Sequence, residues 1–174
     1  NDMLSYALPT LLDDLALVAS YTPNGDGGAD SSTSFSATYT GVEGLTIAYG
    51  QGEDNKATLT ADATAWKVSY AYGPVTVTAT DLEYDHETAT SSRDMTSQAV
   101  SYTLTDEISI GYGEEEISDG TASSEKAEFS GFDVSYTAGG MTLKAYAQEA
   151  ENISYSTTAT EDQEIWAVNA TFAF

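Results

Sequence analysis

The last stretch of the chain, residues 162–174, alternates apolar positions with small or polar ones. Successive side chains of a β-strand point to opposite faces, so this pattern predicts a strand with one continuous apolar face. The apolar positions are Phe174, Phe172, Ala170, Val168 and Trp166.

The same design recurs upstream, with a tyrosine just before each of several short turns. Tyr6, Tyr39, Tyr72, Tyr102 and Tyr136 follow one another at intervals of roughly 30 to 34 residues. Gly, Pro, Asp and Thr fill the turns, and each turn is followed by a new alternating run. This period predicts paired antiparallel strands, ten in all, before the terminal one. The expected strands are Met3–Leu8, Leu15–Thr22, Thr33–Thr40, Leu45–Gly50, Ala63–Tyr72, Val75–Tyr84, Met95–Leu104, Ile108–Gly113, Phe129–Thr137 and Met141–Gln148.

Alternate residues of each strand form two sets, which we call its two parities and which point to opposite faces. The two parities differ in chemistry. One carries Leu, Ile, Val, Phe, Trp and Tyr, and the other is mostly Ser, Thr, Gly and Ala. Large apolar residues on one face suit hydrocarbon, and small polar residues on the other suit a water-filled interior. The opposite parity also carries Lys67, Asp133, Lys144, Tyr146 and Asn169, which we expect to face a pore.

Long polar connections are expected on the side of the sheet opposite the short turns. Several long loops in one compact domain need a reason, and a membrane barrel with short turns on one side and long loops on the other supplies one. The expected loops are Pro23–Ser32, Gln51–Asp62, Asp85–Asp94, Glu114–Glu128 and Glu149–Glu164.

These patterns predict an all-β, antiparallel transmembrane β-barrel, of which this chain supplies about eleven strands. The alternative is a secreted all-β sandwich. A sandwich buries its large apolar residues and exposes a face richer in Lys and Glu than the polar parity here.

Composition narrows the function classes. The 28 acidic residues outnumber the five Lys and Arg, for a formal charge of -23, which argues against nucleic-acid binding. The absence of cysteine excludes disulfides and thiol chemistry. Mean hydropathy is low, as expected when only every second strand residue meets lipid.

Catalytic and tight metal-binding chemistry find little support in the sequence. His86 is the only histidine, and it lies in an acidic stretch that we interpret as a solvated loop, without a credible Ser or second His relay. Asp26 and Asp30 lie in a Gly-rich turn that lacks the closing glutamate of a calcium loop. We therefore expect no enzyme and no cofactor, with loosely bound divalent cations as the exception.

Three phrases resemble one known family over the whole chain. They are N-D-M-L-S-Y-A-L-P at residues 1–9, G-V-E-G-L-T-I-A-Y-G at residues 41–50, and V-N-A-T-F-A-F at residues 168–174. Together they resemble the C-terminal part, about strands six to sixteen, of a sixteen-stranded general porin of the alphaproteobacterial outer membrane. Residues 1–174 would then form the C-terminal portion of a single barrel domain, without the N-terminal part that holds most of the family's constriction zone.

The resemblance implies an outer-membrane pore for passive diffusion of small hydrophilic solutes and ions. It also implies a multi-pass barrel in contact with outer-membrane lipid and lipopolysaccharide, a homotrimer, and insertion by the barrel-assembly machinery. A structural or adhesive barrel without an open pore remains the other function to test. Phe172 and Phe174 are similar to the family's C-terminal assembly signal.

Two further sets of residues carry expectations. An acidic extracellular rim should favour cations, because rings of carboxylates attract them; it comprises Glu114, Glu115, Glu116 and Asp119. Aromatic side chains prefer the membrane interface, with Tyr21, Tyr49, Tyr84 and Tyr112 expected nearer the extracellular side. The girdle at the other side should comprise Tyr39, Tyr72, Tyr102, Tyr136 and Phe174, beside Tyr6.

Deleting Phe174 should impair assembly in cells more than it harms the finished barrel. The side chain is expected to act as a recognition signal, and a terminal residue contributes little to the sheet itself. The measurement is the outer-membrane yield of the full-length protein with and without Phe174. An unchanged yield would remove the support for a signal at this position.

Overall fold

The computed structural model of the chain describes residues 3–9, 12–23, 31–56, 59–88, 91–121, 125–156 and 161–172. Within them the chain forms one antiparallel sheet of eleven strands, in which spatial order follows sequence order. No helix in this part is long and apolar enough to cross a membrane. The strands are β1 (Leu4–Ala7), β2 (Leu15–Thr22), β3 (Ser31–Val42), β4 (Leu45–Lys56), β5 (Leu59–Tyr72), β6 (Val75–His86), β7 (Arg93–Thr103), β8 (Ile108–Asp119), β9 (Ala127–Ala138), β10 (Met141–Glu151) and β11 (Gln163–Phe172).

The predicted all-β fold and the predicted number of strands are confirmed, but the expected long loops are wrong in extent. β8 continues to Asp119 and so includes the acidic run Glu114–Glu116, which we had expected in a loop. Only positions 57 and 58 separate the end of β4 from the start of β5. A run of consecutive polar residues shows no alternation, so the sequence predicted a loop there. A strand that extends beyond the hydrocarbon can carry polar residues on both faces.

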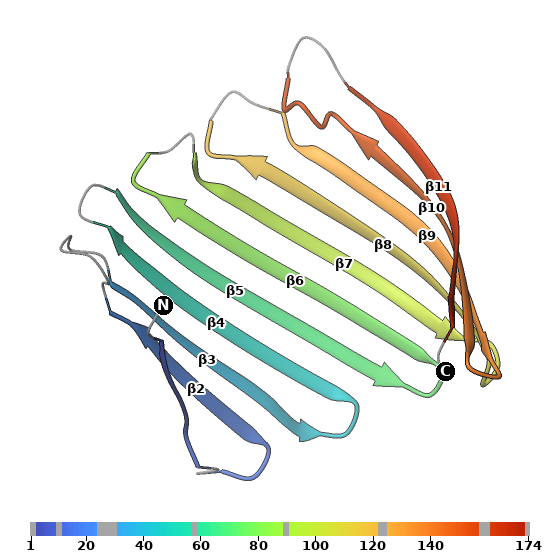
Figure 1. The fold of residues 1–174 in the computed structure, drawn as a ribbon, viewed down its shortest axis with the longest axis horizontal. Coiled ribbons are helices and arrows are strands. Elements are labelled where there is room, and N and C mark those ends of the chain that lie inside the picture. The colour runs from blue at the N-terminus through green and yellow to red at the C-terminus, as the bar shows by residue number, and fades with distance from the viewer. Residues whose placement is uncertain are drawn as a thin grey trace.

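The short turns between strands all lie at one end of the sheet (Figure 1). Gly44, Gly73 and Gly140 have positive φ angles of 76°, 56° and 80°, which glycine adopts without a steric penalty. At Gly44 a Cβ atom would also collide with the backbone carbonyl oxygen of Ala71, so both conformation and space require glycine. These turns fix which residues of adjacent strands lie opposite each other.

The sheet is curved, and β1 and β11 form its two separate edges (Figure 1). Each interior strand is hydrogen-bonded on both sides, over as many as twelve consecutive residue pairs between β4 and β5. A sheet of this kind holds its strands mainly through the backbone ladder.

Very few residues are buried. Among the described residues, only Ala61, Ala127 and Asn152 fall in the buried class, at 8%, 1% and 7% exposure. Large apolar side chains are instead exposed on one face, which we call the outer face; Trp66, Phe132 and Trp166 are 49%, 50% and 80% exposed. A soluble sandwich would cover such residues with a second sheet, and here no second layer exists among the described residues.

The tyrosines before the short turns lie on the outer face, near the turn end of the sheet. Tyr72 and Tyr102 both lie opposite Val75, and Tyr136 lies opposite Ile108. Tyr39 lies opposite Leu15 on the same face. Phe172 faces Met141 at the end of β11, whereas Phe174 lies outside the described residues.

A second aromatic row marks the other boundary of the apolar band. The Tyr49 and Trp66 rings lie 4.4 Å apart, and the Tyr49 hydroxyl donates a hydrogen bond of 3.1 Å to Gln51. Tyr84 does not belong to this row, contrary to our expectation. The register places it opposite Ala63 and Arg93, on the inner face, because β6 follows its parity unbroken from Thr76 to His86.

Val134 provides a test of which face meets lipid. It lies at mid-strand on the outer face, opposite Ile110 and Ala145. Replacing Val134 by Arg should cost about 2–4 kcal/mol of folding free energy if the side chain meets the middle of the bilayer. Equilibrium unfolding from lipid vesicles measures the cost.

The control is Ser101→Arg, near the end of β7 on the inner face, between Thr76 and Gly111. An Arg there would remain in water, so its cost should be much smaller. Equal costs for the two variants would mean that the assignment of the faces is wrong.

Candidate functional site: the inner face of the sheet

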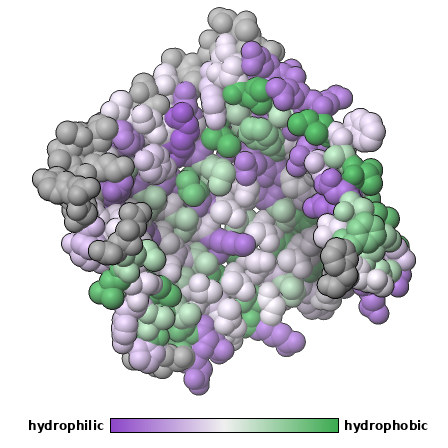
Figure 2. Space-filling view, viewed as in Figure 1, coloured by the Kyte–Doolittle hydropathy of each residue, from purple (hydrophilic) through white to green (hydrophobic). Residues whose placement is uncertain are grey.

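The inner face is the parity opposite the exposed apolar residues, and it is built from small side chains. Across neighbouring strands, Ser36 faces Gly50, and Gly50 faces Ala65. Further along the sheet, Ser101 faces Gly111. The space-filling view shows a centre that is mostly pale, the colour of residues of intermediate hydropathy (Figure 2). Small side chains leave the space above this face open.

The register places all five residues expected to face a pore on the inner face. Lys67 lies between Ala48 and Thr80. Tyr146 lies opposite Asp133, and Lys144 lies opposite Asn169. Four of the five therefore form a compact polar group on β9, β10 and β11: Asp133, Lys144, Tyr146 and Asn169.

One ion pair organises this group. The Lys144 ammonium lies 3.3 Å from the Asp133 carboxylate, and both side chains remain partly exposed. Gly111 on β8 makes room for it, because a Cβ atom at that position would lie 2.7 Å from an Asp133 carboxylate oxygen. An exposed pair of this kind contributes little to stability. Its consequence is that the two charges largely cancel at the wall.

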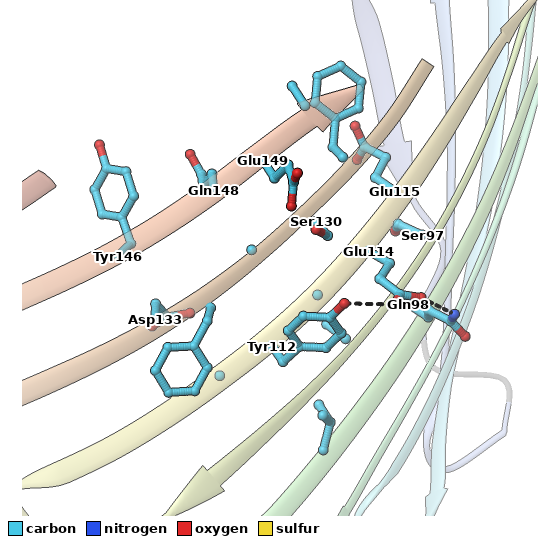
Figure 3. Close-up of a pocket in the computed structure, with 18 of the residues that line it drawn as sticks. Ser97, Gln98, Tyr112, Glu114, Glu115, Ser130, Asp133, Tyr146, Gln148 and Glu149 are labelled. Carbon is cyan, nitrogen blue, oxygen red and sulfur yellow. Dashed lines mark hydrogen bonds between the residues drawn. The ribbon is translucent and has the colours of Figure 1, made fainter. Parts of the chain in front are cut away.

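The polar group borders a hollow of about 1150 Å³ over β6 to β11. Tyr146 and Gln148 project side by side from β10, and Asp133 lies on the neighbouring strand (Figure 3). Sequence reasoning missed Gln148 and Glu115 as members of this wall, although both share the inner parity with the residues it named. Gln148 ends an expected strand and could have been assigned from the alternation directly, and continuing the alternation beyond Gly113 would have found Glu115.

The acidic run of β8 is divided between the two faces. Glu115 faces Ser97 and Phe129 on the inner face, and Asp119 shares that parity. Glu114 and Glu116 lie on the outer face. The strand conformation, which the loop assignment missed, imposes this division.

Each of the two outer-face glutamates has a hydrogen-bonding partner. The Tyr112 hydroxyl donates to Glu114 at 2.7 Å, and the Gln98 amide donates to the same carboxylate at 2.8 Å (Figure 3). The Lys126 ammonium lies 2.8 Å from Glu116. This hydrogen bond and the Glu116 charge raise the pKa of Lys126 above its ordinary value. Tyr112 thus marks the point at which the outer face changes from apolar to acidic.

The remaining candidates for catalysis or metal binding are His86 and the aspartates of the Gly-rich turn. His86 ends β6 instead of lying in a loop, and its Nδ1 accepts a 3.0 Å hydrogen bond from the Thr88 amide. In the part of the chain that the structure describes, no group of three or more His, Cys, Asp or Glu is arranged to hold a metal ion. Asp26 and Asp30 lie outside the described residues.

A single-layer sheet with an exposed apolar outer face, aromatic borders and a small, polar inner face is the wall of a β-barrel membrane protein. The Gram-negative porin family model matches residues 1–127. The chain belongs to this family, and it is a protein of the outer membrane. A search of curated proteins found no match.

Solved outer-membrane proteins share the fold at low identity. A loop-deletion mutant of OmpT from Vibrio cholerae matches with a TM-score of 0.69 and 16% identity, over 98% of this chain and 62% of that one. OccK10 of Pseudomonas aeruginosa matches with a TM-score of 0.70 and 10% identity, over 99% and 63%. The NanC porin matches with a TM-score of 0.56 and 9% identity, over 99% and 98%. The chain thus spans less than two thirds of the length of the first two.

Replacing Asp133 by Asn should shift ion preference toward anions. The substitution removes the carboxylate that balances Lys144 and leaves a net positive charge on the inner wall. Reversal potentials of the reconstituted protein across a salt gradient measure the shift. Asp81→Asn is the control, because Asp81 lies opposite Trp66 on the outer face and should leave the potential unchanged. Equal shifts in both variants would contradict the assignment of Asp133 to the pore wall.

Proposed function

We propose that this chain forms most of the wall of a water-filled channel for passive diffusion of small hydrophilic solutes and ions. One observation carries the proposal: in the half of the sheet nearer the short turns, the strands carry large apolar residues on the outer face and mostly small or polar residues on the inner face. Small inner side chains leave a wide, wetted lumen, which is all that unselective diffusion requires. An enzyme would need a catalytic group, and the family and the structural matches are consistent with a channel instead.

Additional strands close the barrel in this proposal. β1 and β11 each have one partner within the described sheet, and a free strand edge in lipid leaves backbone groups unsatisfied. The chain also superposes better on part of a longer outer-membrane protein than on nearly all of the shorter NanC porin, which supports an arc of a wider barrel. We assign the chain to strands six to sixteen of a sixteen-stranded, alphaproteobacterial-type porin that forms a homotrimer.

The surroundings of the barrel follow from its outer face. The apolar band contacts outer-membrane lipid, and the acidic border that includes Glu114 and Glu116 lies at the level of lipopolysaccharide headgroups. Since those headgroups are also anionic, loosely held divalent cations balance the charge between them. The barrel-assembly machinery inserts the chain by reading its C-terminal strand.

A planar-bilayer recording of the complete polypeptide that carries this chain tests the channel. Stepwise, ohmic conductance is expected, together with uptake of small sugars into vesicles. Insertion without conductance would instead support a structural or adhesive barrel.

We further propose that the channel prefers cations, with the inner-face carboxylates responsible. Glu115 lies on the inner wall and Glu114 on the outer face of the same strand, which provides a matched pair of variants. Glu115→Gln should reduce the cation preference measured by reversal potential. The effect should be clearest at low salt, because the Debye screening length shortens to about 8 Å at physiological ionic strength. Glu114→Gln should have little effect. An anion-selective parent channel, or equal effects of the two variants, would sink the proposal.

A further inference from the structure

The connection between β10 and β11 contains a turn that is fixed against its neighbours. Asn152 is 7% exposed, in a structure where almost every other described residue is at least partly exposed. Its side-chain amide donates to the Lys126 carbonyl at 3.1 Å, and its side-chain oxygen accepts from the Ser156 amide at 3.1 Å. Its backbone amide donates to the Asp162 carboxylate at 3.1 Å. Asn152 therefore ties the turn to the entry of β9 and to the entry of β11.

The backbone of this turn has an unusual conformation. Asn152 and Tyr155 have φ angles of 52° and 54°, in the left-handed region. Asparagine tolerates this region, but for a bulky residue such as tyrosine it is uncommon and persists only where the surroundings hold it. The Tyr155 amide donates to the Asn152 carbonyl at 3.0 Å, which closes the turn. We infer that the contacts around Tyr155 hold it in this conformation.

Tyr155 contacts β7, which is not adjacent to β10 in the sheet. The Arg93 guanidinium carbon lies 5.8 Å from the centre of the Tyr155 ring, within the range of a cation–π contact. Arg93 begins β7 and lies opposite Tyr84 and Asp119 on the inner parity. The turn itself continues from β10, so two strands, β8 and β9, separate it from Arg93. Three ordinary interstrand spacings amount to about 14 Å, which this short turn bridges.

The turn passes on the inner side of the wall. Ile153 lines the same hollow as Phe129 and Glu115, which lie on the inner face of β9 and β8. The peptide that Asn152 binds joins Lys126 to Ala127, a residue that is only 1% exposed. Residues 152–156 thus cover the ends of β8 and β9 from within.

We propose that residues 152–156 form a fixed constriction at the end of the channel opposite the short turns, with Tyr155 as the residue that limits solute size. Arg93 and Asn152 are positioning residues that hold it there. The inference rests on the channel function proposed above, and it locates the narrowing within this chain. Hydrophilic solutes that the rest of the small-residue lumen admits would be excluded by the Tyr155 ring.

Residues 1–174 contain no cysteine, so a single introduced cysteine can be tested in the complete protein once any cysteine outside this chain is replaced by serine. Tyr155→Cys should conduct, and a charged methanethiosulfonate should then cause a stepwise loss of current. Thr96→Cys is the matched control, because Thr96 lies at the same end of the sheet on the exposed outer face, opposite Asp81 and Glu116. Its modification should leave the current unchanged. A labelled Tyr155→Cys channel without loss of current would overturn the constriction.

A second variant releases the turn. Asn152→Ala should increase single-channel conductance and admit larger sugars, whereas Gln98→Ala, which removes an outer-face hydrogen bond to Glu114, should do neither. Unchanged size exclusion in Asn152→Ala would also count against the proposal.

A cross-linking measurement separates this inference from the channel function. With cysteines at Arg93 and Tyr155, a short bismaleimide should join the two sites in the folded protein, whether or not the protein conducts. Failure to cross-link, with both cysteines labelled singly, would place the turn away from β7 and refute the inference. Cross-linking in a protein that never conducts would refute the channel function and, with it, the role of Tyr155 in permeation.

Discussion

The hydrogen-bond ladder between neighbouring strands is the interaction on which the whole structure depends. In hydrocarbon, an unpaired backbone amide or carbonyl has no water to replace its partner, so every strand must be paired on both sides. The chain accordingly pairs each strand with its sequence neighbours, and its described residues form almost no buried core. The usual source of folding free energy, apolar burial inside the protein, is replaced by lipid contact outside it. This explains why residues such as Trp66 and Trp166 are highly exposed in the protein alone.

Because the ladder fixes the backbone, function is left to the alternation of side chains. Each strand contributes to two unrelated surfaces, and adjacent residues such as Glu114 and Glu115 have different surroundings. On the outer face, Tyr112 and Tyr49 direct their hydroxyls toward the polar border. On the inner face, small residues keep the lumen wide, and glycine at position 111 gives the Asp133 side chain its space. The paired charges of Asp133 and Lys144 give the wall polarity with little net charge.

The turn at residues 152–156 departs from this regular plan. A barrel wall made from strands alone has a uniform width, so any narrowing requires a segment that leaves the ladder and satisfies its own backbone groups. Asn152 meets this need with both backbone and side-chain hydrogen bonds, and Arg93 holds the aromatic ring at the far side of β8 and β9. Regular strands thus set the width of the channel, and the turn at residues 152–156 narrows it.

The sequence by itself determined the strands, their number and, except for Tyr84, the face of the residues it named, because a period of two is set by local backbone geometry and survives without tertiary information. It placed Lys67, Asp133, Lys144, Tyr146 and Asn169 on one parity for this reason. It could not determine where the strands end, since polar residues on both faces look the same in a loop and in a strand that extends beyond the membrane. Only the tertiary structure decided that β8 continues through the acidic run, which puts Glu114 and Glu115 on opposite faces. It alone also decided that Asn152 binds Lys126 and that Tyr155 contacts Arg93 of β7. Those contacts join segments far apart in the chain, and no local pattern encodes them.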